Sequence, residues 1–269
     1  MSETALSSAT KPYGGLMLPS RNAVLPWVRR YIEDERHSGG IQIAHEYSWD
    51  FRVLGGLLER VRRAAEAYLL LERDGFAAEG RPLVRSALEH AVIAQWAFLT
   101  PSGVDRLEVG ILRSRIDYAK RTRDDDDPEW DDMITRMQQR IPLGADGRIR
   151  RGMPKFSGRD SILSTVDHTR YLRRAYAVLS RAGHVTDQAV TDYFVSDGDT
   201  TAVAATPADT YDLDVFHTLA TCCCLAGWLQ ARLEGDVHEQ NLATRQRLLW
   251  RLDTHLAREQ RRFPDETDD

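Results

Sequence analysis

The stretch GRPLVRSALEHAVIAQWAF, residues 80–98, decides the fold class because it is apolar along most of its length yet carries three inner ionisable residues. Its apolar residues recur at helical spacing, and Pro82 suits a first helical turn, so the stretch predicts a helix that lies in the core. Arg85, Glu89 and His90 interrupt this apolar helix, and burying an unpaired charge is costly. The sequence therefore predicts that these side chains find partners, either in one another or on a second helix.

Helical patterns also dominate the rest of the chain, while strand signals and repeats are nearly absent. The apolar spacing and the Gly, Pro and Asp punctuation predict further helices over about residues 22–38, 49–74, 105–123, 127–141, 161–183, 210–234 and 237–262. A polar loop is predicted at 195–210. These patterns predict one all-α domain over residues 21–262, a multi-helix bundle with long C-terminal helices, between a mobile N-terminal arm at 1–20 and an acidic tail at 263–269.

The composition is that of an ordinary folded protein. Hydrophobic residues make up 42% of the chain and charged residues 29%, which excludes a disordered chain. The net charge of −5 excludes a protein whose whole surface attracts nucleic acid. No apolar run reaches the roughly 18 to 20 residues that span a bilayer, and the first residues lack the basic start and apolar stretch of a secretory signal. We therefore expect a cytoplasmic protein without a membrane segment.

Three consecutive cysteines, Cys222, Cys223 and Cys224, stand within a predicted helix. Neighbouring side chains on a helix point about 100° apart, so these thiols do not form the spaced framework of a disulfide or a zinc site. Free cysteine packs as a small hydrophobic residue, and we expect all three in the core of a protein from a reducing compartment.

Metal ligands are poorly arranged elsewhere in the sequence. Glu89, His90 and His184 offer ligand atoms, but an adjacent Glu and His do not easily face one ion, and no Glu-x-x-His pair is present. The acidic run at 124–127 is most simply a solvated helix entry that the helix dipole favours, with metal binding as the alternative. We therefore expect neither a metal nor another cofactor.

A partner for the inner ionisable residues is visible in the segment YAVLSRAGH. Tyr176, Ser180 and His184 fall at i, i+4 and i+8, which gives one polar stripe on a helix. Arg85 and Glu89 lie about 40° apart on their own helix and can form an ion pair. Two such stripes that face each other would satisfy one another and enclose a small polar pocket. The structural alternative to a functional pocket is an ion pair that fixes how two helices align.

The segment RSALEH has an Arg and a His separated by four residues, and it resembles the signature of the HEPN superfamily of helical proteins. In that superfamily such a pair commonly forms a metal-independent ribonuclease site across a homodimer interface. The resemblance implies that Arg85 holds the scissile phosphate and that His90 assists proton transfer at the 2′-hydroxyl or the leaving oxygen. Ser86 stands where Asn, Asp or His is usual. Because Arg85 and His90 lie about 140° apart on a straight helix, a second subunit or a helix end must bring them together.

A second resemblance covers more of the chain. The order RSALEHAVIAQWAF, GMPKFSGRDSIL and YAVLSRAGH is similar to a group of helical proteins from high-GC bacteria with no established activity. These proteins carry an Arg–Glu helix followed by a Tyr–Ser–His helix, and the similarity spans about residues 50–190. It implies that the two polar stripes pair with each other.

The charges are unevenly distributed. Residues 148–181 hold nine Lys or Arg against two acidic residues, a local charge of +7, so the rest of the chain carries about −12. Basic residues that precede the Tyr–Ser–His helix in the sequence suit RNA phosphates or another anion. The candidates are Arg148, Arg150, Arg151, Lys155 and Arg159. The alternative is a surface that balances the acidic residues at 124–132.

Together these patterns predict an HEPN-like homodimer that cleaves or binds RNA, of the toxin or phage-defence type. The alternative is a non-catalytic helical module that binds a partner protein or a small anionic ligand and whose polar stripes are structural. The two hypotheses differ in whether RSALEH acts on a substrate or only joins helices.

Overall fold

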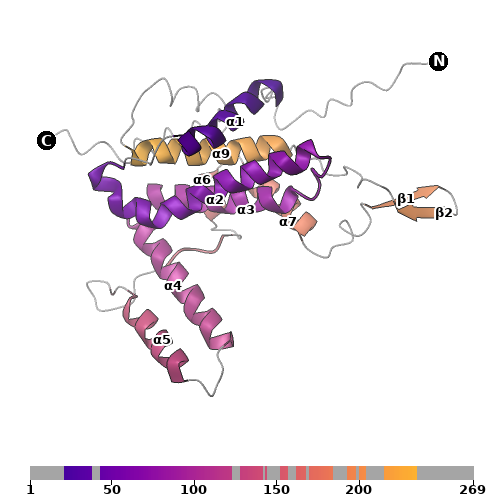
Figure 1. Ribbon diagram of the computed structural model, residues 1–269. Coiled ribbons are helices and arrows are strands. Elements are labelled where there is room, and N and C mark those ends of the chain that lie inside the picture. The colour runs from indigo at the N-terminus through magenta and orange to yellow at the C-terminus, as the bar shows by residue number, and fades with distance from the viewer. Residues whose placement is uncertain are drawn as a thin grey trace, which may run out of the picture.

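The helices of the fold gather around α3, which contacts α2, α4, α6, α7 and α9 (Figure 1). The structure is a computed structural model that describes residues 21–37, 43–122, 128–141, 143, 152–156, 162–167, 170–183, 193–197, 200–203 and 215–234. Its helices are α1 (Arg21–His37), the 3-10 helix η1 (His45–Tyr47), α2 (Ser48–Arg73), α3 (Arg81–Leu99), α4 (Gly103–Thr122), α5 (Pro128–Gln139), α6 (Ile162–Val166), α7 (Tyr171–Gly183) and α9 (Val215–Leu233). Helix α1 packs on α2 and α9.

Helix α3 has almost no face toward solvent. Its buried residues are Arg81, Val84, Ala87, Leu88, Ala91, Val92, Ala94, Gln95, Trp96, Ala97 and Leu99. The alanines among them let the flanking helices approach closely, because each side chain adds a single carbon beyond the backbone. A polar group on α3 must therefore find most of its partners within the protein, since water reaches little of the helix surface.

The described residues are mostly helical, which confirms the predicted all-α class. Helices α1 to α5 begin and end within about two residues of their predicted bounds. Gly75, the predicted stop of α2, has a φ of 90°, a left-handed conformation that glycine adopts without strain. The predicted N-terminal arm at 1–20, the helix at 237–262 and the tail at 263–269 lie outside the described residues.

The prediction of one helix over 161–183 is wrong, because the chain forms two helices there. Helix α6 ends at Val166, and α7 begins at Tyr171 directly after Arg170, whose φ of 64° does not occur within a helix. The buried Asp167 accepts the backbone N–H of Leu172 at 2.7 Å, so its carboxylate satisfies a donor at the start of α7. This contact separates the two helices, and both pack on α3.

A short antiparallel β-hairpin lies where the sequence predicts a polar loop. Strand β1 (Phe194–Asp197) pairs with β2 (Thr200–Val203) in the register Phe194↔Val203. The β-branched residues of both strands and the Asp-Gly pair at 197–198 favour such a hairpin. Tyr193, just before β1, donates its hydroxyl to Glu79 at 2.8 Å and so ties the β-hairpin to the turn between α2 and α3.

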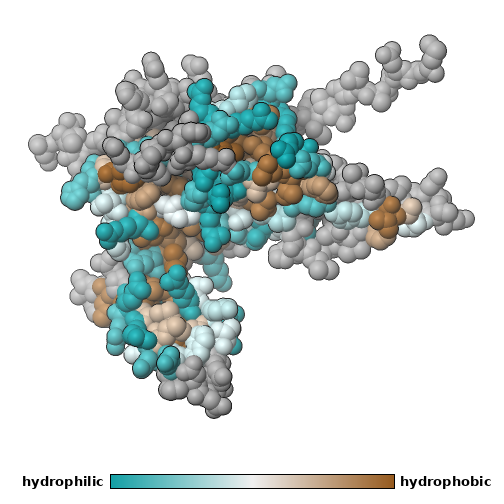
Figure 2. All heavy atoms as spheres, viewed as in Figure 1, coloured by the Kyte–Doolittle hydropathy of each residue, from teal (hydrophilic) through white to brown (hydrophobic). Residues whose placement is uncertain are grey.

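The outer half of α4 and the whole of α5 project from the bundle as an α-hairpin, residues 111–122 and 128–141 (Figure 1). Its own small core consists of Ile116, Ala119 and Ile134, packed against partly buried Trp130, Met133, Met137 and Ile141. The first half of α4 belongs to the main core through Val104 and Leu107. In Figure 2 the outer surface of the α-hairpin is mainly teal or pale, whereas brown apolar side chains show between the helices of the bundle. Helix α4 therefore connects two separate cores.

Residues 152–156, called the docked segment below, join α4 to α7. The N–H of Met153 donates to the backbone carbonyl of Arg106 on α4 at 2.9 Å. The ring of Phe156 meets that of Tyr176 on α7 edge to face, with centroids 4.8 Å apart. The docked segment thus fixes part of the predicted basic region against the bundle.

The three consecutive cysteines form no disulfide and are buried in α9, as the sequence predicts for core residues. Each is almost completely removed from water, although neighbouring side chains on a helix point in different directions. Helix α9 is therefore apolar around most of its circumference and is enclosed by α1, α2 and α3. Within the part of the chain that the structure describes, no helix combines the length and the apolar character that crossing a membrane requires.

We expect the three thiols of the native protein to be inert toward a disulfide reagent such as DTNB. Burial raises the pKa of the Cys222 and Cys223 thiols well above the ordinary value, so little reactive thiolate forms, and packing keeps the reagent out. All three thiols should react once about 6 M guanidinium unfolds the chain. A thiol that reacts quickly under native conditions would show that α9 is accessible.

Candidate functional site

Arg85 is the centre of a polar cluster that joins α3 to α7. Its Nε donates to the Ser180 hydroxyl at 3.0 Å and its Nη2 donates to the Tyr176 hydroxyl at 3.0 Å. The same Nη2 lies 2.9 Å from Oε1 of Glu89, one helical turn along α3. These four residues, called the Arg85 cluster, confirm the predicted contact between the two polar stripes, while His184 lies outside the described residues.

The Arg85 cluster is only partly removed from water. The side chains of Arg85 and Glu89 are 27% and 28% exposed, so solvent still screens their attraction. The guanidinium also lies over the Tyr176 ring, 5.1 Å from its centroid, which adds a cation–π contact. Among the described residues the third guanidinium nitrogen, Nη1, has no hydrogen-bond or ion-pair partner. Arg85 therefore holds two helices together and keeps one pair of N–H donors available.

His90 is bonded within its own helix. Its Nδ1 lies 2.5 Å from the backbone oxygen of Ser86 and 3.3 Å from the Ser86 hydroxyl. A carbonyl oxygen only accepts, so Nδ1 carries the hydrogen in the neutral ring and Nε2 is left as an acceptor. Arg85 and His90 make no contact with each other in the described part of the chain, in keeping with their separation of about 140° around α3.

Only one of the five predicted anion-binding residues can be placed. Arg148, Arg150, Arg151 and Arg159 lie outside the described residues. Lys155 is exposed on the docked segment, directly before the Phe156 that packs on Tyr176. The docked segment therefore brings one predicted basic residue to the edge of the Arg85 cluster.

A second set of cations lies on α7. These residues contribute to the local charge of +7 over residues 148–181 but were not among the predicted anion-binding residues. The basic face of α7 consists of the exposed Arg170, Arg173, Arg174 and Arg181. No acidic residue occurs between Tyr171 and Gly183, within α7 itself. Arg170, Arg174 and Arg181 fall within about 40° of one another around the helix, and Arg173 lies between them and Tyr176. The spacing of these arginines, together with the absence of acidic residues, is the sequence pattern from which the basic face could have been predicted.

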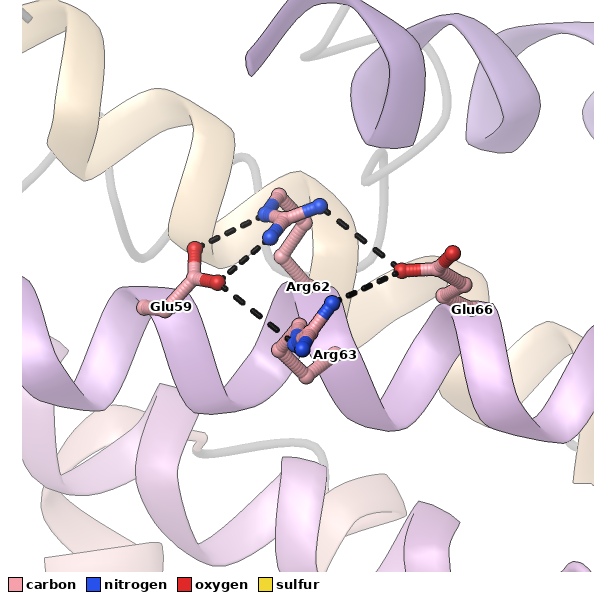
Figure 3. Close-up of polar contacts among 4 residues, drawn as sticks. All are labelled: Glu59, Arg62, Arg63 and Glu66. Atoms are coloured by element: carbon pink, nitrogen blue, oxygen red, sulfur yellow. Dashed lines mark hydrogen bonds and ion pairs between the residues drawn. The ribbon is translucent and has the colours of Figure 1, made fainter. Parts of the chain in front are cut away.

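A charged cluster on α2 was not identified from the sequence (Figure 3). Arg62, only 8% exposed, continues the buried stripe of Leu54 and Leu58 and binds Glu59 through two hydrogen bonds. Arg63 and Glu66 complete an alternating group of two cations and two anions. The hydrogen bonds from Arg62 hold the pKa of the Glu59 carboxyl below its ordinary value.

We interpret this α2 cluster as a structural group and not as a binding site. Its charges cancel, and the partly buried guanidinium of Arg62 already has carboxylates on both sides (Figure 3). The spacing i, i+3, i+4 and i+7 is visible in the sequence, but the same spacing is common on solvated helix faces. Only the packing of α2 distinguishes a partly buried structural cluster from charges on a solvated helix face.

The described residues contain no group of three or more His, Cys, Asp or Glu side chains that could hold a metal ion. The acidic run at 124–127, for which metal binding was the alternative, lies outside them. The side-chain groups present at the candidate site are guanidinium, hydroxyl, carboxylate and imidazole groups.

Comparisons with protein-family models, with curated proteins and with solved structures gave no match to this chain. The resemblance of RSALEH to the HEPN signature therefore stays a prediction. What the chain does must be argued from the Arg85 cluster, His90 and the basic face of α7.

We expect Arg85→Ala to lower the free energy of unfolding by about 2 kcal/mol, because it removes the donor to both Tyr176 and Ser180. Glu89→Ala should cost only about 0.5 to 1 kcal/mol, because that ion pair is partly solvated. Urea unfolding of both variants measures the difference, with Arg52→Ala on the exposed face of α2 as the control. Equal losses in the two variants would mean that the ion pair, and not the contact with α7, holds Arg85.

Proposed function

We propose that this protein binds RNA through the basic face of α7 and Lys155, beside the Arg85 cluster. The observation that carries the proposal is the set of exposed arginines on a helix without acidic residues. Guanidinium groups bind phosphates with two parallel hydrogen bonds, and several in a row suit a polyanionic backbone. Because the whole chain has a net charge of −5, such binding would be confined to this face.

The Arg85 cluster supports this choice of face. The inward side of α7 is formed by the buried Leu172, Ala175 and Leu179, which leaves the arginines exposed to solvent. Tyr176 and Ser180 lie at the edge of that side, where they bond Arg85, and Arg173 is their neighbour around the helix. The docked segment adds Lys155 next to Tyr176. RNA, rather than DNA, is proposed because of the resemblance of RSALEH to the HEPN signature.

The finer proposal is that the protein also cleaves RNA, as an HEPN-like ribonuclease of the toxin or phage-defence type. His90 Nε2 would accept the proton of a 2′-hydroxyl, and the resulting oxygen would attack the phosphorus to form a 2′,3′-cyclic phosphate. The 5′-oxygen would take a proton from a solvent water as its bond to phosphorus breaks, and His90 Nε2 would return its proton to solvent, while Arg85 Nη1 neutralises the developing charge. Because one chain keeps these groups apart, the proposal requires a homodimer in which each site takes one residue from each subunit.

The alternative is a non-catalytic module that binds a partner protein or a small anionic ligand. One observation favours it: two of the three guanidinium nitrogens of Arg85 are already bonded within the chain, as a purely structural residue requires. RNA binding without cleavage is compatible with this observation, whereas the absence of RNA binding would favour the alternative.

Replacing Arg170 and Arg173 together by Glu should weaken RNA binding and reduce its dependence on salt. Each phosphate contact with a single strand contributes about 0.7 to the slope of log affinity against log salt, so we expect the slope to fall by about 1.4. Fluorescence polarisation with a labelled RNA measures the slope. The matched control is Arg52→Glu with Arg60→Glu, which makes the same charge change at exposed positions of α2. The proposal fails if both double variants lose affinity equally or if neither does.

His90→Ala tests the cleavage proposal separately. Cleavage of total RNA should disappear, while the melting temperature stays close to that of the native protein, because His90 bonds only within its own helix. Native cleavage should persist in EDTA and leave a 2′,3′-cyclic phosphate. The control is His45→Ala, which removes an exposed histidine of η1. RNA that is bound but left intact by the native protein would exclude the ribonuclease.

A further inference from the structure

The α-hairpin exposes an aromatic residue that no packing contact explains. The side chain of Tyr118 on α4 is 63% exposed. Ile116 and Ala119, which form the small core with α5, lie about 160° and 100° around the helix from it. Among the described residues the Tyr118 ring has no stacking partner and its hydroxyl no hydrogen bond, although its backbone carbonyl accepts from Thr122 at 2.9 Å. Tyr118 therefore offers a free aromatic face to solvent.

Cations surround this aromatic face. Arg115 and Arg121 lie one helical turn on either side of Tyr118, each about 60° away around the axis, and both are exposed. Arg121 uses Nε to bond the backbone carbonyl of Asp117 at 3.2 Å, which leaves its two terminal nitrogens for other partners. Asp117 is the single acidic residue against four basic ones in the outer half of α4. The outer half of α4 is thus positive as well as aromatic on the side of Tyr118.

Further basic residues lie between this surface and the basic face of α7. The docked segment bonds α4 at Arg106 and stacks on α7 through Phe156. Farther out on the same side of α4, Arg113 lies beside the docked segment, since a Cβ built on Gly152 would be 3.5 Å from its Nη1. Arg113 lies about 140° around α4 from Tyr118, with Arg121 between them, so cations are spaced around the outer half of α4 from the docked segment to Tyr118.

We infer that the outer face of α4 is a contact site for single-stranded RNA, in which Tyr118 stacks on an unpaired base and Arg115 and Arg121 bind the flanking phosphates. This inference rests on the proposed RNA binding and extends it from α7 to the α-hairpin. Aromatic rings among cations are the usual means by which proteins hold single strands, because every base has a flat face and every nucleotide a phosphate. Bases in a duplex stack on one another and present no such face, so the site selects unpaired RNA.

The test combines variants of Tyr118 with three probes: a labelled unstructured RNA of about 20 nucleotides, the matching duplex, and a strand of equal length without bases. Tyr118→Ala should weaken binding of the unstructured RNA by about 5- to 100-fold, as expected for the loss of one stacked base. Tyr118→Phe keeps the ring and should bind like the native protein. Tyr118→Leu keeps apolar area without the ring and should behave like Tyr118→Ala. Binding of the duplex and of the baseless strand should not change in any variant.

Two controls separate this inference from the proposal on which it rests. Phe76→Ala removes another exposed aromatic ring, 53% exposed between α2 and α3, and should not affect RNA binding. The α7 double variant Arg170→Glu/Arg173→Glu should weaken all three probes. If the native protein binds no probe, the proposed function fails and the inference fails with it.

If the α7 double variant weakens binding while Tyr118→Ala binds like the native protein, only the inference is overturned. Equal losses of Tyr118→Ala on all three probes would also overturn it, because a stacking residue cannot act on a strand without bases. Melting curves of each variant should match the native protein, since Tyr118 contributes nothing to either core.

Discussion

The small solvent face of α3 is the constraint on which the other features depend. Helices pack on several sides of α3, so the polar groups that it carries must find most of their partners within the protein. Arg85 meets this requirement through Tyr176 and Ser180, and these bonds fix which side of α7 turns inward. The arginines of α7 face solvent because Leu172, Ala175 and Leu179 form the buried side of the same helix. The polar cluster and the basic face are neighbouring sides of one helix, with Arg173 next to Ser180.

Much of this arrangement could be predicted from sequence, because helix geometry fixes which residues share a face. The spacing of Arg85 and Glu89 predicted their ion pair, and the spacing of Tyr176 and Ser180 predicted the polar stripe that bonds Arg85. The break before α7 could not be foreseen, because it depends on a buried carboxylate that bonds a backbone N–H five residues away. Whether an aromatic or charged residue is buried also depends on distant helices. Periodicity alone did not reveal the exposure of Tyr118 or the burial of Arg62.

The structural and functional interpretations of Arg85 do not exclude each other. A residue that joins two helices and keeps two N–H donors for a ligand serves both purposes, so loss of activity in an Arg85 variant cannot distinguish them. The surface residues of α7 and of the α-hairpin lie outside both cores and are free of this ambiguity. They are the positions at which chemistry can be separated from folding.

Helix α4 belongs to two cores of very different size, and this division has a consequence for the dynamics of the protein. The small core holds three buried side chains, so opening it exposes far less apolar surface than global unfolding does. Amide protons of α5 should therefore exchange with solvent through local opening, while those of α3 should exchange only when the whole bundle unfolds. The α-hairpin would then form a separate cooperative unit, hinged where α4 leaves the main core, and any ligand that binds it in the closed form would slow that exchange in proportion to its affinity.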